Sequence, residues 1–188
     1  MPLTDLFGVL RRMAEVFEER GIPYAVSGAV AQNFWGVVRT TLDLDLLMTV
    51  PSIRVPAFVD RLKECGGRLD LAEALRSLRE EHVLRFTLED VPVEIFVPYL
   101  PFHASVLGRA VRLTIGERAY PVVTAEDLIV LKALFHREKD WSDIAGILLR
   151  RGKDLDRGYV DSWLQSLVPN GDDRLRRWEE AVREASGA

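Results

Sequence analysis

The sequence predicts an α/β (α+β) protein in which a mixed β-sheet is flanked by helices and followed by a helical C-terminal region. Three observations support this prediction. Helical and strand-like patterns alternate in the first part of the chain, two hairpin patterns follow, and from Thr124 onward the patterns are helical. A sheet covered by helices is a common domain architecture, because each element must bury its apolar face against another layer.

The first elements alternate between helix and strand. Apolar residues three and four apart predict a helix over residues 3–20, which Gly21 and Pro23 end. The order strand, helix, strand, helix follows, over residues 24–26, 29–35, 42–50 and 55–65. Two hairpins come next, residues 83–88 with 91–97 and residues 110–115 with 118–123, with turns at Glu89-Asp90 and Gly116-Glu117.

The rest of the chain is predicted to be helical. Four helices are expected, over residues 125–135, 141–149, 157–167 and 172–185. Thr124 suits the N-cap of the first, with Asp127 at the third helical position. We therefore divide the chain into a core, residues 1–123, and a helical C-terminal region, residues 124–188, packed on that core.

The composition is that of an ordinary folded protein. Of 188 residues, 48% are hydrophobic and 29% are charged, which is enough apolar surface for a core. No apolar run approaches the ~20 residues of a membrane helix, and the N-terminus lacks a signal-peptide pattern. The single cysteine, Cys65, cannot form an internal disulfide, so we expect a cytoplasmic protein. The net charge of −4 argues against a broad nucleic-acid-binding face.

Asp43 and Asp45 alternate with leucines in the strongest predicted strand. Successive side chains of a strand point to opposite faces, so Asp43 and Asp45 share one face. Leu42, Leu44 and Leu46 are expected to pack the core. Two carboxylates this close repel each other unless a cation lies between them, and oxygen ligands favour Mg²⁺ or Mn²⁺. The alternative for an Asp-x-Asp pattern taken alone is a solvated surface pair.

Ser27-Gly28 lies at the turn from the first strand into the second helix. Gly28 permits a tight turn and lets the backbone approach a phosphate, and the N–H groups of the following helix would face that anion. An ordinary turn glycine is the alternative. Arg39 precedes the carboxylates, where it could contact a phosphate or pair with Asp43 in a structural role.

Glu94 stands in an otherwise apolar strand of the first predicted hairpin. A lone carboxylate there is costly unless it is paired or binds a metal. If this strand neighbours residues 42–50, Glu94 can join Asp43 and Asp45. Three carboxylates could then hold two divalent ions for an in-line phosphoryl displacement.

Together these residues resemble a known superfamily. A glycine turn that opens a helix, then Arg39-Thr40-Thr41-Leu42-Asp43-Leu44-Asp45, then a carboxylate on a later strand, is similar to the DNA polymerase β-like nucleotidyltransferases. More narrowly, Ser27-Gly28-Ala29 and this segment look like the small bacterial and archaeal group that includes the abortive-infection nucleotidyltransferase toxins. That group also carries a downstream lysine and an Arg-x-Lys-Asp segment, which Lys132 and Arg137-Glu138-Lys139-Asp140 match. The resemblance covers about residues 24–149.

The resemblance implies a nucleotidyltransferase fold and a metal-dependent activity. A nucleoside monophosphate would move from an NTP to a hydroxyl acceptor, on RNA (a tRNA end) or on a protein. By analogy Asp43 and Asp45 would bind Mg²⁺ or Mn²⁺, and Glu94 would be the third metal-binding carboxylate and help to activate the acceptor hydroxyl. These three residues are the predicted catalytic and metal-binding set.

The resemblance also assigns residues to the NTP. Ser27 and Gly28 would hold the triphosphate, Arg39 is a candidate phosphate contact, and Lys132 would neutralise the charge of the β- and γ-phosphates. An exposed lysine on a helix surface is the alternative for Lys132. Phosphoryl transfer depends mostly on positioning and charge stabilisation, so these residue types suit the reaction.

Two departures from the group motivate a second hypothesis. The group more often has Gly-Gly or Gly-Ser where this chain has Ser27-Gly28, and Asp where it has Glu94. The chain could therefore be a catalytically weak or inactive module that acts through a protein partner, such as the mate in a toxin–antitoxin pair. A third hypothesis is an α/β domain with a chance Asp-x-Asp.

Overall fold

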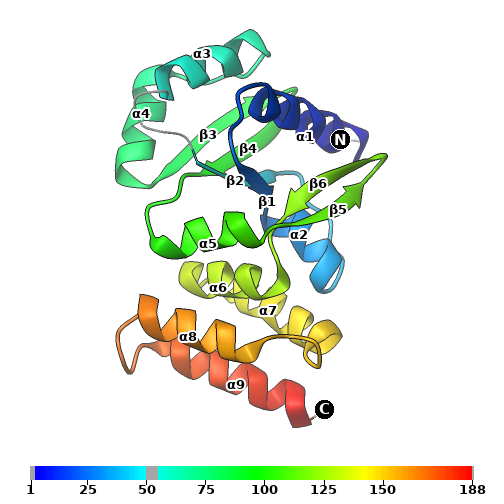
Figure 1. Cartoon of the computed structure of the whole chain (residues 1–188), viewed down its shortest axis with the longest axis vertical. Helices are drawn as coiled ribbons and strands as arrows, with labels where there is room; N and C mark the ends of the chain where they lie inside the picture. The colour runs from blue at the N-terminus through cyan, green and yellow to red at the C-terminus, as the bar shows by residue number, and fades with distance from the viewer. Residues whose placement is uncertain (1–2, 50–54, 188) are drawn as a thin grey trace. The chain divides into compact units, whose positions relative to one another are not determined.

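The computed structural model describes residues 3–49 and 55–187, which divide into two compact units (Figure 1). The first unit comprises Met1–Val30 and Thr40–Val123, and the second comprises Ala31–Arg39 and Thr124–Ala188. The sequence-based division places residues 31–39 in the core, whereas in the structure this segment belongs with the C-terminal helices.

The described strands form one sheet that lies within the first unit. Its order is β3-β4-β2-β1-β6-β5. The strands are β1 Tyr24–Val26, β2 Leu44–Met48, β3 Val83–Leu88, β4 Val91–Phe96, β5 Val111–Ile115 and β6 Arg118–Val122. The pairs β1 with β6 and β2 with β4 are parallel, and the other pairs are antiparallel. The predicted mixed sheet is therefore confirmed, and both hairpins turn at the predicted dipeptides.

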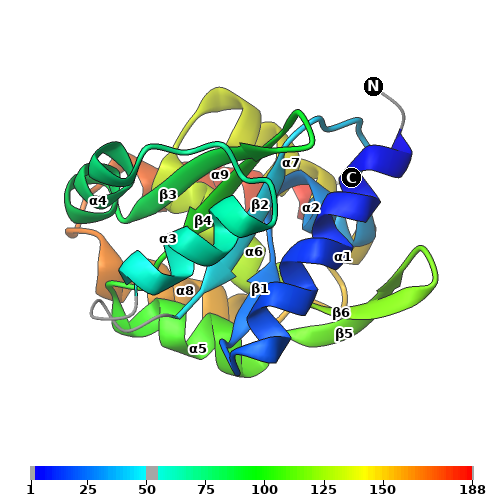
Figure 2. The same cartoon turned by 90° about the horizontal axis from the view of Figure 1, so that it is seen from above.

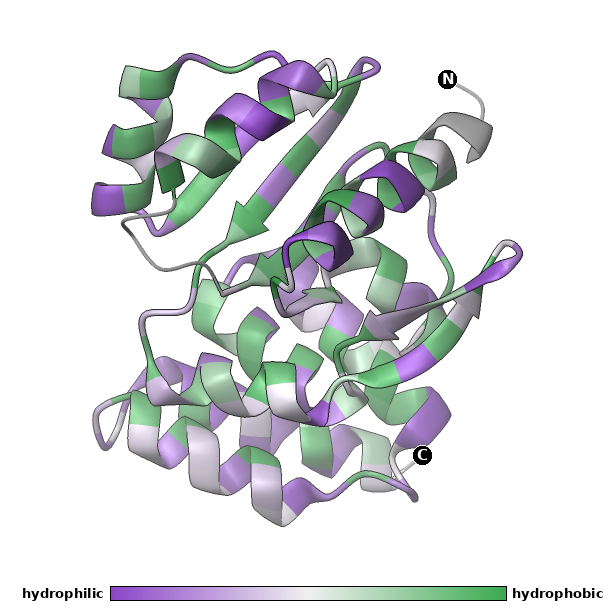
Figure 3. Ribbon diagram, turned by 45° about the horizontal axis from the view of Figure 1, so that its top comes forward, coloured by the Kyte–Doolittle hydropathy of each residue, from purple (hydrophilic) through white to green (hydrophobic). Residues whose placement is uncertain are grey.

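Helices cover the sheet of the first unit. They are α1 (Leu3–Glu19), the start of α2 (Gly28–Trp35), α3 (Val55–Glu64), α4 (Leu71–Glu80) and α5 (Pro101–Arg109). α1 and α3 lie on one face of the sheet (Figure 2), where the Phe17 ring is 5.9 Å from Phe58 and 4.8 Å from Tyr24. Hydrophobic and hydrophilic residues alternate along α1 and α3 (Figure 3), as expected for helices that bury one face.

The helices α4 and α5 are absent from the sequence prediction. Asp70 caps α4, because its side chain accepts the backbone N–H of Glu73 at 2.9 Å. Pro101 stands at the first position of α5, where the N–H that proline lacks is not needed. α4 packs against β3, the edge strand of the sheet.

The start of α5 depends on a buried histidine, His103, which is 7% exposed. Its Nδ1 accepts the backbone N–H groups of Tyr99 and Leu100, each at 3.4 Å. Burial, together with the charge of nearby His82, lowers the pKa of His103 to about 4. The folded protein therefore holds this imidazole neutral.

We expect the free energy of unfolding to fall as the pH drops from about 6.5, the usual histidine pKa, toward the pKa of about 4 in the folded state. In this interval the unfolded chain takes up a proton at His103 that the folded protein excludes, which lowers the free energy of unfolding by about 3 kcal/mol. Denaturant unfolding at several pH values measures the slope. His103→Asn keeps an acceptor but does not titrate, so its slope should be shallower, and equal slopes would contradict the prediction.

The second unit consists of helices and the segment Ala31–Arg39. Its helices are the rest of α2, α6 (Ala125–Phe135), α7 (Glu138–Arg151), α8 (Arg157–Leu167) and α9 (Asp173–Gly187), so the four predicted C-terminal helices are confirmed. Thr124 is the N-cap of α6, as predicted, and accepts the N–H of Asp127 at 3.2 Å. Over residues 3–49 and 55–187, no helix combines the length and apolar character needed to cross a bilayer.

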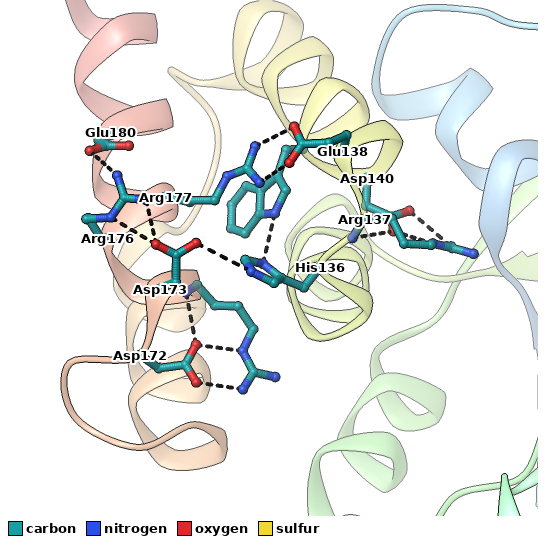
Figure 4. Close-up of polar contacts among 11 residues, drawn as sticks. His136, Arg137, Glu138, Asp140, Asp172, Asp173, Arg176, Arg177 and Glu180 are labelled. Atoms are coloured by element: carbon teal, nitrogen blue, oxygen red, sulfur yellow. Dashed lines mark hydrogen bonds and ion pairs between the residues drawn. The ribbon is translucent and has the colours of Figure 1, made fainter.

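Polar contacts tie α9 to α7 and to the turn between α6 and α7 (Figure 4). Arg177 of α9 pairs with Glu138 of α7, with Nη2 2.9 Å from Oε2. His136, which ends α6 with a φ of +58°, accepts the indole N–H of Trp141 at 3.1 Å through Nδ1. Its Nε2 lies 3.4 Å from the carboxylate of Asp173 on α9. These contacts fix α9 within the second unit.

Contacts with α7 explain why residues 31–39 belong to the second unit. Gln32 Nε2 donates to the carbonyl of Asp143 at 3.0 Å, and Arg150 donates to the carbonyl of Gly36 at 2.7 Å. A Cβ on Gly146 would lie 3.2 Å from a methyl group of Val37, so α7 comes very close to this segment. The segment is built into the second unit rather than left as a surface loop.

Candidate active site

Four polar residues lie in one row across the sheet. The pairing of β2 with β4 places Asp45 beside Glu94, and the pairing of β4 with β3 places Glu94 beside Arg85. On the other side of β2, the N–H of Ser27 donates to the carbonyl of Asp45 at 2.9 Å and extends the β1–β2 ladder. Residues in register on neighbouring strands point to the same face. We call Ser27, Asp45, Glu94 and Arg85 the polar row.

The polar row lies on the face of the sheet opposite Leu44 and Leu46. Leu44 and Leu46, on either side of Asp45, are fully buried, and their partners on β4 are Val93 and Ile95, which are also buried. Strand alternation therefore keeps the leucines on one face and the carboxylate on the other. The strand of Glu94 therefore neighbours the strand of Asp45, as the sequence analysis required for the two carboxylates to approach each other. Backbone pairing within one sheet holds both residues.

Asp43 lies one residue before β2 rather than inside the strand. Its side chain is exposed and accepts a hydrogen bond from the Thr41 hydroxyl. Leu42 is 61% exposed, so the expectation that it packs the core is wrong. The pairing of β2 with β4 begins at Leu44, and none of the described strands pairs with the residues just before it to set their alternation. The predicted end of this strand, Val50, lies outside the described residues.

Gly28 brings the backbone directly against the Asp45 carboxylate. Its φ is +55°, in the left-handed region that favours glycine. A Cβ built on Gly28 would lie 1.7 Å from Oδ2 of Asp45, so the turn has no room for a side chain. The tight turn predicted from the sequence is confirmed, and its close neighbour in the structure is a carboxylate of the polar row.

We expect Gly28→Ala to lower the free energy of unfolding by more than Gly116→Ala does. Gly116 also has a left-handed φ, +63°, but a Cβ there meets no atom within 4 Å. Gly116→Ala should therefore cost only the backbone strain, about 1–2 kcal/mol. Gly28→Ala should cost about 1–3 kcal/mol more, because Asp45 must move. Denaturant unfolding of both variants measures the difference, and equal losses would contradict the close contact.

Glu94 is paired with a cation that the sequence analysis does not identify. Arg85 Nε lies 3.1 Å from Oε1 of Glu94. The same guanidinium reaches α4, with Nη1 2.6 Å from Oε2 of Glu81 and 3.2 Å from the hydroxyl of Ser77. The sequence contains a signal for this pair: a two-residue turn at Glu89-Asp90 fixes the hairpin register in which residue 85 faces residue 94.

The donor set of the polar row fits a magnesium-type ion. Asp45 and Glu94 offer carboxylate oxygens, and Mg²⁺ is usually held by one or two carboxylates together with waters and substrate phosphates. Within the part of the chain that the structure describes, no group of three or more His, Cys, Asp or Glu side chains is arranged to hold a metal. A centre built from Asp43, Asp45 and Glu94 together therefore stays a prediction.

Arg39 and Lys132 share one carboxylate in the second unit. Lys132 Nζ lies 2.6 Å from Oδ2 of Asp143. Arg39 donates to both oxygens of Asp143, through Nε and Nη2, each at 3.2 Å. The structural partner of Arg39 is thus Asp143 rather than Asp43, and Lys132 is 5% exposed rather than a surface lysine. Their contact with a triphosphate stays a prediction.

Asp140 completes a charge cluster, which we define as Arg39, Lys132, Asp140 and Asp143. Three of these residues are buried, and the Arg39 side chain is 41% exposed. Asp140 lies 4.0 Å from Lys132 Nζ and binds Arg137 through both oxygens, at 2.6 and 3.2 Å. Burial alone would raise the pKa of Asp143, but the hydrogen bond and charge of Lys132, followed by those of Arg39, outweigh burial and lower this pKa. Asp143 is therefore held as a carboxylate.

Comparisons with known proteins identify a family and a similar fold. Residues 6–173 match the family model described as "Nucleotidyl transferase of unknown function (DUF2204)". The solution structure of the antibiotic-resistance factor ANT(2″)-Ia is similar with a TM-score of 0.62 at 14% identity, covering 87% of this chain and 93% of that chain. Its crystal structure with adenylyl-2″-tobramycin gives 0.59 at 13% identity, covering 86% and 98%.

An antibiotic adenylyltransferase also has a similar fold. The lincomycin-bound lincosamide antibiotic adenylyltransferase LnuA gives a TM-score of 0.52 at 14% identity, covering 78% of this chain and 96% of that chain. No curated protein is significantly similar in sequence to this chain. Likeness at such low identity shows the fold, and the predicted nucleotidyltransferase fold is confirmed.

Proposed function

This chain belongs to the nucleotidyl transferase family DUF2204, and we propose that it moves a nucleoside monophosphate from an NTP to a hydroxyl acceptor with the help of a divalent metal. The observation that supports this proposal is the polar row, in which Asp45 and Glu94 stand side by side on neighbouring strands. Ser27 belongs to the same row, and the start of α2 adjoins it. Paired carboxylates beside a helix N-terminus are suited to holding a triphosphate and its metal.

We assign the residues of the row to parts of one displacement. The Ser27 hydroxyl and the first N–H groups of α2 bind oxygens of the triphosphate. The acceptor oxygen forms a bond to the α-phosphorus while the bond to the bridging oxygen breaks, and pyrophosphate leaves. Glu94 takes the proton of the acceptor hydroxyl. Asp45 and Glu94, with Asp43, would hold Mg²⁺ or Mn²⁺, which would supply positive charge to balance the triphosphate.

Arg39 and Lys132 are proposed to serve the β- and γ-phosphates. Both cations share the Asp143 carboxylate. The other carboxylate of the charge cluster, Asp140, pairs with Arg137 at 2.6 Å and lies 4.0 Å from Lys132. The two carboxylates do not balance the three cations Arg39, Lys132 and Arg137, so a positive charge is left over. A phosphate oxygen is a suitable partner for that charge.

The acceptor supplies the hydroxyl group that attacks the α-phosphorus. We propose a hydroxyl on RNA, such as a tRNA end, or on a protein. The similar structures named above contain an adenylylated aminoglycoside and a lincosamide antibiotic, so both classes belong among the acceptors to test. The alternative, a weak or inactive module acting through a partner such as an antitoxin, draws support from the Arg85–Glu94 ion pair, because Glu94 already has a cation.

A labelling experiment tests the proposal. The purified protein is incubated with each α-labelled NTP, Mg²⁺ or Mn²⁺, and four acceptors in turn: total RNA, the protein itself, tobramycin and lincomycin. Label that enters one of these and disappears in an Asp45→Asn variant identifies the nucleotide and the acceptor class together. The absence of label with every NTP would count against the enzyme and favour the partner-binding alternative.

A further inference from the structure

Arg85 occupies an unusual position for a residue outside the predicted site. It ends the polar row next to Glu94, one strand away from Asp45. Its guanidinium bridges two carboxylates, at 3.1 Å from Glu94 on the neighbouring strand and at 2.6 Å from Glu81, the C-cap residue of α4. The shorter contact is the one to the carboxylate outside the row. Arg85 therefore has a partner that it can keep when it leaves Glu94.

The surroundings of Arg85 give it room to shift toward α4. A groove of about 570 Å³ lies between α4 and β3, and Arg85, Glu81 and Ser77 are among its lining residues. The Arg85 side chain is 46% exposed, so the guanidinium is not locked into the core. Ser77 already accepts a hydrogen bond from Nη1 at 3.2 Å. A small movement into the groove would lengthen the contact with Glu94 and keep the two contacts with α4.

We propose that Arg85 is the resident counter-ion of Glu94 and that it yields this carboxylate to the divalent metal while it keeps Glu81 and Ser77 as partners. This inference rests on the metal centre of the proposed function. The exchange replaces one cation by another, so Glu94 never stands as a lone carboxylate beside Asp45. Arg85 is thus a positioning residue that acts through Glu94, and it sets how tightly the metal binds.

The charges of Arg85 and Glu81 set the direction in which each substitution should change the affinity for the metal. Arg85 and the metal compete for the same carboxylate, so a variant without the guanidinium should bind the metal more tightly. Glu81 draws Arg85 away from Glu94, so a variant without the Glu81 charge should bind the metal more weakly. The two substitutions therefore have opposite signs, whereas general damage to the fold would weaken binding in both.

The test is direct binding of Mn²⁺, followed by the loss of the EPR signal of the free ion. Arg85→Gln should bind Mn²⁺ about three- to tenfold more tightly than the unchanged protein, and Glu81→Gln about two- to threefold more weakly. Arg68→Gln and Glu73→Gln are the matched controls. They remove the same charges from the same groove without contact to Glu94, since Arg68 pairs with Asp90 and Glu73 with Arg76.

Each outcome is decisive. Tighter binding in Arg85→Gln, with smaller changes in the two controls, supports the exchange. Equal or weaker binding in Arg85→Gln overturns it, and so does tighter binding in Glu81→Gln. If the Asp45→Asn variant binds Mn²⁺ as tightly as the unchanged protein, the metal centre of the proposed function is wrong. This result is separate from a failure of Arg85 to compete with the metal.

Discussion

Asp45→Asn should lower nucleotidyl transfer by about a thousandfold and leave the fold intact. The amide has the same shape as the carboxylate, so the close contact with Gly28 is kept. It lacks the negative charge that a divalent metal requires, and Glu94 alone beside it cannot replace that charge. The rate of label transfer measures the loss, and circular dichroism with denaturant unfolding verifies the fold.

Asp90→Asn is the matched control. Asp90 lies in the β3–β4 turn with a φ of +64°, which asparagine tolerates, and its side chain is 72% exposed. Transfer by this variant should stay within about twofold of the unchanged protein, as expected of a surface substitution. Asp43→Asn tests the remaining predicted ligand. Full activity in Asp45→Asn would remove the polar row from the mechanism, whereas full activity in Asp43→Asn would restrict the metal to Asp45 and Glu94.

Asp143→Asn should lower the free energy of unfolding by about 3–5 kcal/mol, the usual cost of removing one partner from a buried ion pair. Asp143 holds Lys132 and Arg39 at once, and the lysine is 5% exposed. An amide accepts a hydrogen bond but does not balance the two cations. Thermal and denaturant unfolding measure the loss. Asp154→Asn removes an exposed carboxylate 3.9 Å from Arg151 and should change stability by less than about 0.5 kcal/mol.

The loss in Asp143→Asn should depend on pH in one direction. The pKa of Asp143 is lowered in the folded protein, so its contribution is fully present above about pH 3.9, the unfolded aspartate pKa. As the pH falls through the folded pKa, the carboxylate takes up a proton and the contribution disappears. The difference in stability between the two proteins should therefore shrink in acid. A difference that stays constant below pH 3.9 would show that shape, rather than charge, makes Asp143 stabilising.

Local patterns explain why much of the sheet could be predicted. The dipeptide Glu89-Asp90 marked one turn and Gly116-Glu117 the other, and both hairpins form around them. Apolar spacing identified the C-terminal helices, and Thr124 fixed the start of the first. Each of these signals lies within a few residues of the feature that it predicts, so no knowledge of the distant chain is required.

The parts that the sequence did not reveal depend on distant partners. Asp43 looks like a strand residue, but β2 begins only where β4 supplies hydrogen bonds, at Leu44. Arg39 precedes Asp43 closely, yet its partner Asp143 is more than a hundred residues away along the chain. No local pattern joins Arg39 to Asp143, so the pairing requires the fold itself. Arg85 lies between these two cases. Its pairing with Glu94 depends only on the register of one hairpin, which the turn at Glu89-Asp90 sets.

The assignment of residues 31–39 to the second unit limits how the two units can evolve. The chain passes from one unit to the other three times, after Val30, after Arg39 and after Val123. A fragment that begins at Thr124 would lack Arg39 and Gln32, both of which bind Asp143. The complementary fragment would carry these two side chains without their partner. Recombination between Val123 and Thr124 would therefore separate Asp143 from Arg39 and Gln32 in both products. We expect the two units to evolve together for this reason.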